Sequence, residues 1–146
     1  MKRQAIIPVE TLSACITQMP ERAVRKLLGL LAGEELTVVR GPLTGLVMMS
    51  ALDSFQADFY LGEVLVTEAE VTYGECRGYG MVIGDDPERA IARASVEAVG
   101  ASRNRILQER VQRFLSAEAN KIEFRRKKGA SLIARTRVDF ETMKRT

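Results

Sequence analysis

The sequence predicts a single α+β domain over residues 1–146: an N-terminal helical hairpin, an antiparallel β-meander of three to four strands, and C-terminal helices packed on the sheet. Three observations predict this class. Apolar side chains recur at helical spacing near both ends of the chain, apolar runs typical of strands occupy the middle, and short connections join those runs. A chain of this length buries roughly two-thirds of its extended surface on folding, which is enough for a core of its own.

The first two predicted elements are helices. Pro8 and Pro20 are expected at their first helical positions, where the fixed φ of proline suits a helix and no amide is lost. Gly33 is expected to stop the second helix. The apolar stripes of the two helices are Val9, Leu12, Ile16 and Met19, then Val24, Leu27, Leu28 and Leu31. The basic residues expected to face water are Arg22, Arg25 and Lys26.

Four runs in the middle of the chain are predicted strands: 35–40, 46–52, 61–73 and 76–83. Gly41-Pro42 is expected to end the first run, and Gly74-Glu75 fits a two-residue hairpin turn. Glu63, Glu68 and Glu70 offer oxygen ligands for a divalent cation. A solvated sheet face is the favoured interpretation, because acidic side chains are mostly exposed.

A third helix is predicted to begin at the segment Gly84-Asp85-Asp86-Pro87, with Asp86 as N-cap and Pro87 as its first residue. Simple capping is favoured over phosphate binding, because two aspartates repel a phosphate and the Lys-Ser/Thr of a Walker motif is missing. Gly78-Tyr79-Gly80 does not precede a helix as a dinucleotide-binding motif would. The small-residue face of this helix is Ala90, Ala94, Ala98 and Ala101.

The rest of the chain is predicted to be helical and increasingly basic. Gly100 and Ser102 are expected to bend or break the third helix. A further helix is predicted to end in the basic run 125–129, because cations suit the C-terminal end of the helix dipole. Residues 130–146 show no clear period, and 125–146 are expected to form a basic extension used in assembly.

Charge is distributed unevenly along the chain. Residues 1–102 hold 9 basic and 14 acidic side chains, whereas residues 103–146 hold 13 basic and 5 acidic ones. A basic segment behind an acidic body indicates an anionic partner or a complementary subunit surface; a solvated helix end is the plainer alternative. Guanidinium groups bind phosphate or carboxylate bidentately. The candidates for an anion-binding or interface role are Arg135, Arg137 and Asp139.

The chain contains no histidine and only two cysteines, Cys15 and Cys76. Without histidine, Ser–His and Cys–His nucleophiles are excluded and the usual metal ligand is missing, so no catalytic residue and no metal site is predicted. Two separate cysteines are too few for a zinc or iron–sulfur site, and we expect both to be reduced. The composition therefore favours a subunit that works inside a larger assembly.

No membrane or secretory segment is predicted. No apolar run approaches the roughly 18 residues that a membrane span needs. The apolar stretch after the basic start of the chain is too short for a signal peptide. We therefore expect a cytoplasmic protein without a membrane partner, and nucleic acid is not the favoured partner because few aromatic residues accompany the basic ones.

Several segments, taken in order, resemble the PhnG family, a subunit of the bacterial carbon–phosphorus lyase system. They are RGPLTGLVM at 40–48, FYLGE at 59–63, GYGMVIG at 78–84 and, most specifically, TRVDFETM at 136–143. The resemblance spans most of the chain and is weakest around residues 100–130. The family-motif positions are Thr44, Gly45, Gly62, Glu63, Gly84 and Asp86.

The resemblance implies a hetero-oligomer with PhnH-, PhnI- and PhnJ-like subunits, in which the chain occurs in two copies within a symmetric complex. With PhnH- and PhnI-like partners it would support displacement of adenine from ATP by an alkylphosphonate, giving ribose 1-phosphonate 5-triphosphate. This is a transferase step of organophosphonate breakdown. No cofactor is implied for this chain, since ATP and phosphonate are substrates of the complex and the metal and iron–sulfur cluster belong to partner subunits.

Two other functions stay open on the sequence. One is a nucleic-acid-binding or regulatory module that uses the basic C-terminal segment, and the other is a stand-alone enzyme. The chain also departs from the family pattern. A Gly-rich stretch is usual where this chain has residues 53–58, and Gly-Arg-Asp with a following His-Ala is usual where it has Asp85 and Arg89. Asp85 in place of a cation inverts the local charge.

Overall fold

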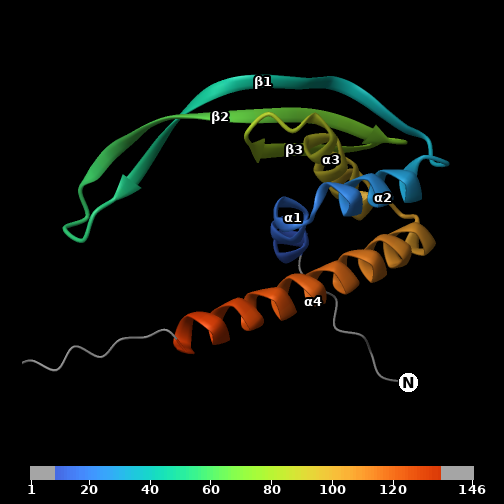
Figure 1. Cartoon of the computed structure of the whole chain (residues 1–146). Coiled ribbons are helices and arrows are strands. Elements are labelled where there is room, and N and C mark those ends of the chain that lie inside the picture. The colour runs from blue at the N-terminus through green and yellow to red at the C-terminus, as the bar shows by residue number, and fades with distance from the viewer. Residues whose placement is uncertain (1–8, 136–146) are drawn as a thin grey trace, which may run out of the picture.

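The computed structural model describes residues 9–135, with the side chains of residues 14–133. A curved sheet forms one layer, α2 and α3 lie beneath it, and α4 crosses below α1 and α2 (Figure 1). The predicted α+β class, with helices at both ends and an antiparallel meander between them, is confirmed. The elements are α1 (Val9–Gln18), α2 (Glu21–Leu31), β1 (Leu36–Leu52), β2 (Asp58–Tyr73), β3 (Cys76–Ile83), α3 (Pro87–Ala101) and α4 (Arg105–Arg135).

The sheet has three antiparallel strands in the order β1-β2-β3. The β2–β3 hairpin turns at Gly74-Glu75, as predicted, with Tyr73 paired to Cys76. Pairing between these strands ends at Val66 and Ile83, whereas β1 and β2 stay paired as far as Leu52 and Asp58. The β1–β2 ribbon therefore continues well beyond β3.

The prediction that Gly41-Pro42 ends the first strand was wrong. β1 runs through this dipeptide as one 17-residue strand, and the Gly41–Pro42 peptide bond is cis. Register shifts on either side of Arg40 show that extra β1 residues bulge out before pairing resumes at Leu43 and Glu68. Gly41 has φ 80°, which a glycine adopts readily, and β1 is an edge strand, where a proline costs no ladder hydrogen bond.

The α3 helix packs directly on the sheet through glycines of β3. A Cβ atom added at Gly78 would lie 2.0 Å from the carbonyl oxygen of Ala94, and one at Gly80 would lie 2.2 Å from that of Ala90. The predicted small-residue face is buried at Ala90, Ala94 and Ala98 but not at Ala101, where the helix ends. The Gly-Tyr-Gly segment thus permits a close helix–sheet approach.

The main core lies between the four helices rather than in the sheet. Cys15 and Ile16 of α1 meet the apolar faces of the other helices, and α4 contacts α1 and α2. The most deeply buried large side chains here are Ile16, Val24, Leu27, Val99, Leu107 and Leu115. The stripe predicted for α2 is confirmed, with Leu28 partly buried; Val9 and Leu12 lie outside the described side chains.

Two helix boundaries differ from the prediction. Pro20 is the N-cap of α2, with extended backbone, and the helix begins at Glu21. Pro8 lies outside the described residues. α4 does not end in the run 125–129 but continues through Gly129 to Arg135. One helical glycine costs only about 1 kcal/mol relative to alanine, and the flanking Arg, Lys and Ala residues are good helix formers.

Candidate functional site

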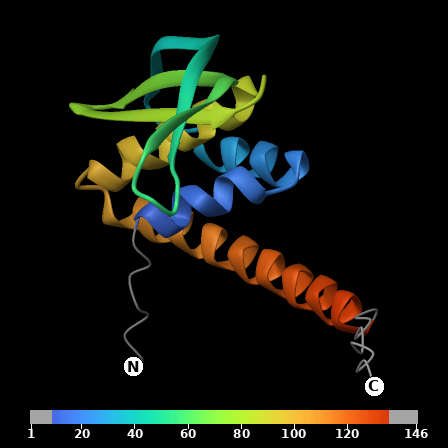
Figure 2. The same ribbon diagram turned by 90° about the vertical axis from the view of Figure 1, so that its left-hand side faces the viewer.

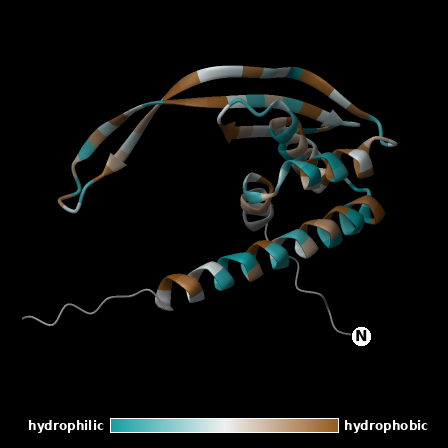
Figure 3. Cartoon of the chain, in the orientation of Figure 1, coloured by the Kyte–Doolittle hydropathy of each residue, from teal (hydrophilic) through white to brown (hydrophobic). Residues whose placement is uncertain are grey.

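A two-stranded ribbon projects beyond β3 and forms the most unusual feature of the molecule. We define it as the β-arm, residues 46–65, which includes the loop between β1 and β2 (Figures 1 and 2). Figure 3 shows apolar residues along both of its strands. The exposed large apolar residues of the β-arm are Leu46, Val47, Met48, Met49, Leu52, Phe55, Phe59, Tyr60, Leu61 and Leu65.

The β-arm is apolar on both faces. Successive residues of a strand point to opposite faces, yet Met48 and Met49 are 58% and 38% exposed, and Tyr60 and Leu61 are 78% and 58% exposed. Gly62, with φ 129°, adjoins a register shift opposite Met49. A two-stranded ribbon is marginal in water by itself, and large exposed apolar patches mark protein–protein contacts. The β-arm therefore has the character of a docking element.

The loop at the tip of the β-arm is ordered by Asp53. Its Oδ1 accepts hydrogen bonds from the backbone amides of Phe55 (2.8 Å) and Ala57 (2.9 Å). The backbone of Gln56 has φ 64° and also donates to the Asp53 carbonyl oxygen. This Asx-type turn leaves the Phe55 ring 87% exposed at the far end of the arm.

At the base of the β-arm, a hydrogen-bond cluster ties β2 to the start of α3. The buried Thr67 hydroxyl donates to the Gly84 carbonyl oxygen (2.7 Å) and accepts from the Asp86 amide (3.1 Å). The Gly84 amide donates to the Leu65 carbonyl oxygen (2.8 Å). Thr44 of β1 donates from its hydroxyl to Asp85 Oδ1 at 3.1 Å. This cluster holds the 84–86 loop against both strands.

The same loop is joined to α1 through Arg89. Asp86 caps α3 by accepting the Arg89 amide at 3.0 Å, as predicted, and its other oxygen accepts Arg89 Nε at 2.7 Å. Arg89 Nη1 donates to the carbonyl oxygens of Ile16 (2.6 Å) and Met19 (2.8 Å), near the end of α1. The carboxylate of Asp86 and the guanidinium of Arg89 therefore both serve the fold. The 84–86 loop carries two carboxylates, which would repel a phosphate rather than bind it.

A family model described as phosphonate metabolism protein PhnG matches residues 9–146. The chain belongs to the PhnG family. This makes it a phosphonate-metabolism subunit that works in a complex with other Phn subunits. A search of curated proteins found no significant match. None of the helices in the described range 9–135 is long and apolar enough to cross a membrane.

The positions predicted from the family resemblance fall into two groups in the structure. Thr44, Gly84 and Asp86 meet in the cluster at the base of the β-arm, with Gly45 beside Thr44. Gly62 and Glu63 lie on the β-arm, where Glu63 pairs with Met48. Because Glu63 is four residues from Thr67, the two groups are about 13 Å apart along the strand.

The predicted C-terminal candidates are not brought into a described site. Arg135 is the last residue of α4, and its side chain lies outside the described ones. Arg137 and Asp139 lie outside the described residues, so their anion-binding or interface role stays a prediction.

Two of the acidic residues of β2, Glu68 and Glu70, are paired with arginines, and Glu63 lies apart from them on the β-arm. Glu68 binds Arg40 (3.0 Å), and Glu70 lies 3.6 Å from Arg40 and 3.5 Å from Arg77. Tyr79 donates to Glu68 at 2.7 Å, and burial, followed by this hydrogen bond, raises the pKa of the Tyr79 hydroxyl. In residues 14–133 no group of three or more potential ligands could hold a metal ion.

The β-arm was missed at the level of sequence. Residues 46–52 and 61–65 were correctly expected to form strands, but as part of an ordinary meander, and the start of β2 at residues 58–60 was not expected to be a strand. The available signal was the lack of alternation: Leu46 to Met49 and Phe59 to Leu61 are continuous apolar runs. Such runs are typical of strands covered on both faces, whereas the part of the chain that the structure describes covers neither face of this ribbon.

Proposed function

We propose that this chain is the PhnG-like subunit of a carbon–phosphorus lyase core complex and that the β-arm is its main assembly element. With PhnH- and PhnI-like subunits it supports displacement of adenine from ATP by an alkylphosphonate, giving ribose 1-phosphonate 5-triphosphate. The observation that carries the proposal is the projecting β-arm, apolar on both faces, in a member of a phosphonate-metabolism family.

The shape of the β-arm defines the contact it makes. A surface patch with one apolar face would suit a flat interface, but a ribbon apolar on both faces suits insertion between partner surfaces. Embedding both faces removes water from the exposed methionine, leucine and aromatic side chains, at about 25 cal/mol per Å² of apolar surface. The partners proposed are PhnH-, PhnI- and PhnJ-like chains in a complex with two copies of this subunit.

The chemistry of the proposed reaction belongs mainly to partner chains. This chain has no histidine, and the one buried carboxylate among residues 14–133, Glu118, is engaged by Lys121 at 2.7 Å. ATP and phosphonate are substrates of the complex, and the metal and iron–sulfur cluster are placed in partner subunits. The contribution of this chain is to shape and stabilise the assembly in the cytoplasm.

Co-expression tests the proposal. The full-length chain and its PhnH-, PhnI- and PhnJ-like partners are purified by a tag on the PhnI-like chain and analysed by size-exclusion chromatography. Tyr60→Asp, on the β-arm, is compared with Ile106→Asp, on α4; the native side chains are 78% and 76% exposed, so the two changes are matched. We expect Tyr60→Asp to abolish co-purification and Ile106→Asp to retain it. A wild-type chain that stays alone would refute the proposal.

The alternative of a nucleic-acid-binding or regulatory module uses the basic C-terminal segment, of which the structure describes the part in α4. It predicts binding to DNA or RNA that weakens steeply with salt, because binding releases counterions from the phosphates. A gel-shift titration at low salt separates the two functions: no shift removes the alternative. Turnover of ATP and phosphonate by the purified chain without partners would instead support a stand-alone enzyme.

A further inference from the structure

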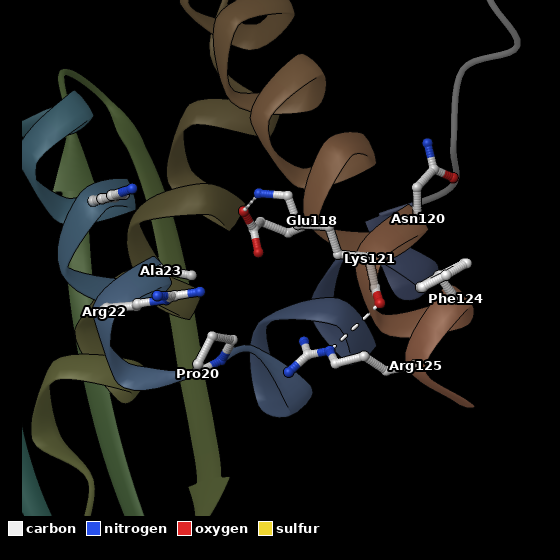
Figure 4. A pocket seen from close by; sticks show the side chains of 9 residues that line it. Pro20, Arg22, Ala23, Glu118, Asn120, Lys121, Phe124 and Arg125 are labelled. Atoms are coloured by element: carbon white, nitrogen blue, oxygen red, sulfur yellow. Dashed lines mark hydrogen bonds and ion pairs between the residues drawn. The ribbon is translucent and has the colours of Figure 1, made fainter. Parts of the chain in front are cut away.

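A basic cleft lies between the start of α2 and the middle of α4, on the side of the molecule away from the sheet (Figure 4). Its volume is about 600 Å³, within the usual range for small-molecule sites. Four basic side chains line it: Arg22, Lys26, Lys121 and Arg125. The other lining residues are Pro20, Ala23, Glu118, Asn120 and Phe124.

The four cations come as two pairs from two helices. Arg22 and Lys26 are four residues apart on α2, and Lys121 and Arg125 are four residues apart on α4, so each pair occupies one helix face. Like charges at this spacing destabilise a helix slightly, and facing two such pairs across one cleft adds to the repulsion. An anion bound between the helices would reverse this effect.

One acidic residue is found among the described residues that line the cleft, and it neutralises one cation. Glu118 has a side chain 8% exposed, and its Oε1 lies 2.7 Å from Lys121 Nζ. Arg125 donates from Nε to the Lys121 carbonyl oxygen at 3.4 Å, and its guanidinium lies on the side of the cleft that faces α2 (Figure 4). Within residues 14–133, Arg22 and Lys26 form no ion pair. The described residues that line the cleft thus carry a net charge of three positive units.

We propose that this cleft binds a small oligophosphate, that is, a phosphate-bearing anion with three or more negative charges. Two guanidinium groups on opposite walls offer bidentate donors for separate phosphate groups. A single phosphate or carboxylate would leave part of the positive charge uncompensated. A nucleic-acid strand needs cations along a track, whereas these four surround one cavity. The inference does not depend on the assembly role of the β-arm.

Titration of the full-length chain with inorganic tripolyphosphate tests the inference, by isothermal calorimetry at low salt. The variant Arg22→Gln/Lys26→Gln removes two cleft cations. Its control, Arg126→Gln/Lys127→Gln, removes two α4 cations that do not line the cleft, so net charge is matched. We expect wild type to bind tripolyphosphate at least tenfold more tightly than orthophosphate. The cleft variant should lose at least tenfold in affinity, and the control less than twofold.

Three results would overturn the inference. Equal losses in both variants would show that only net charge matters. Tighter binding of a poly-glutamate peptide or of an oligonucleotide than of tripolyphosphate would assign the cleft to a macromolecule. Loss of co-purification with the Phn-like partners in the cleft variant, with tripolyphosphate affinity unchanged, would make the cleft a subunit contact. The co-purification readout also separates this inference from the role of the β-arm.

Discussion

Arg89 is bound to Asp86 by a hydrogen-bonded ion pair, Nε to Oδ2 at 2.7 Å, while its Nη1 reaches two carbonyl oxygens near the end of α1. One side chain therefore connects the N-terminus of α3 with the C-terminus of α1. The family pattern expected from the sequence has a histidine at this position. In this chain the position serves tertiary structure, and the adjoining Asp85 is used by Thr44.

Replacing Arg89 with alanine is expected to destabilise the fold by about 2 kcal/mol, because charge-assisted hydrogen bonds are lost and Asp86 and the α1 carbonyls lose their donor. Arg89→Lys should recover only part of this, since lysine cannot bridge both partners. Urea unfolding of the purified chain measures the effect. Arg113→Ala, an exposed change on α4, is the control and should fall within about 0.5 kcal/mol of wild type. Equal unfolding free energies for all variants would show that the Arg89 contacts do not stabilise the fold.

Gly78→Ala is expected to destabilise the chain by about 3 kcal/mol or more, because the new Cβ would lie 2.0 Å from the Ala94 carbonyl oxygen and 2.4 Å from the Ala98 amide nitrogen. Both neighbours are backbone atoms of α3, so the helix itself must move. Gly45→Ala is the matched control, since Gly45 is also a strand glycine but has no atom within 4 Å of an added Cβ. Thermal unfolding should separate the two variants clearly; similar midpoints would contradict the packing described.

Shortening the β-arm should leave the isolated domain folded. Val47 pairs with Val64, so replacing residues 48–63 by Asn-Gly closes a two-residue hairpin. Neither core cluster includes a residue of the β-arm, and we expect the unfolding free energy to change by less than about 1 kcal/mol. Co-purification with partners should be lost. Unfolding of the shortened chain would show instead that the β-arm stabilises the domain.

The two cysteines should react with iodoacetamide very differently. Cys15 is 5% exposed, and burial, with a smaller contribution from Glu118, raises the pKa of its thiol. Cys76 is only half-buried. At pH 8, mass spectrometry should find Cys76 alkylated and Cys15 protected until urea unfolds the chain. Equal labelling of both thiols in native buffer would contradict the burial of Cys15.

The raised pKa of Cys15 also predicts the pH dependence of stability. Above about pH 8.5 the unfolded chain loses the thiol proton while the folded chain keeps it, so the folded state binds more protons. The contribution of Cys15 is therefore fully present below that pH and is lost as pH rises toward the folded pKa. The stability difference between wild type and Cys15→Ala should shrink from pH 8 to 10 in urea titrations. A constant difference would contradict the shift.

The continuation of α4 through Gly129 is tested by hydrogen exchange. In a helix, Gly129→Ala should slow exchange of the neighbouring amides about fivefold, because alanine favours the helix by about 1 kcal/mol. No atom lies within 4 Å of a Cβ added at Gly129, so the change adds no clash. Gly129→Pro should speed exchange in the same segment. No response to either change would place the end of α4 before residue 129.

Local patterns predicted much of the fold because their causes are local. The bounds of β3, the Gly74-Glu75 turn and the Asp86 cap depend on alternation, on backbone preference and on one side chain reaching a nearby amide. The predictions failed where a local stop signal competed with pairing or helix propagation. Gly41-Pro42 forms a bulge within β1, because β2 pairs with β1 on both sides of it. Gly129 lies inside α4, because a single glycine is a weak helix breaker.

The candidate sites were less predictable than the elements. Thr44 and Gly84 are far apart in the sequence, and only the strand register brings Thr44 beside Thr67 and hence beside the 84–86 loop. Likewise, Arg22 and Lys26 were expected simply to face water. They do, but α4 places Lys121 and Arg125 opposite them.

By itself, the sequence determined that this chain is an α+β subunit of the PhnG type without histidine chemistry, since composition, periodicity and motif order need no coordinates. Only the tertiary structure decided that β1 and β2 outrun β3 to form the β-arm, and that two basic helix faces enclose one cleft. The physical reason is that strand pairing and helix packing bring together residues that are far apart in the chain, and their distance along the chain does not predict their distance in space.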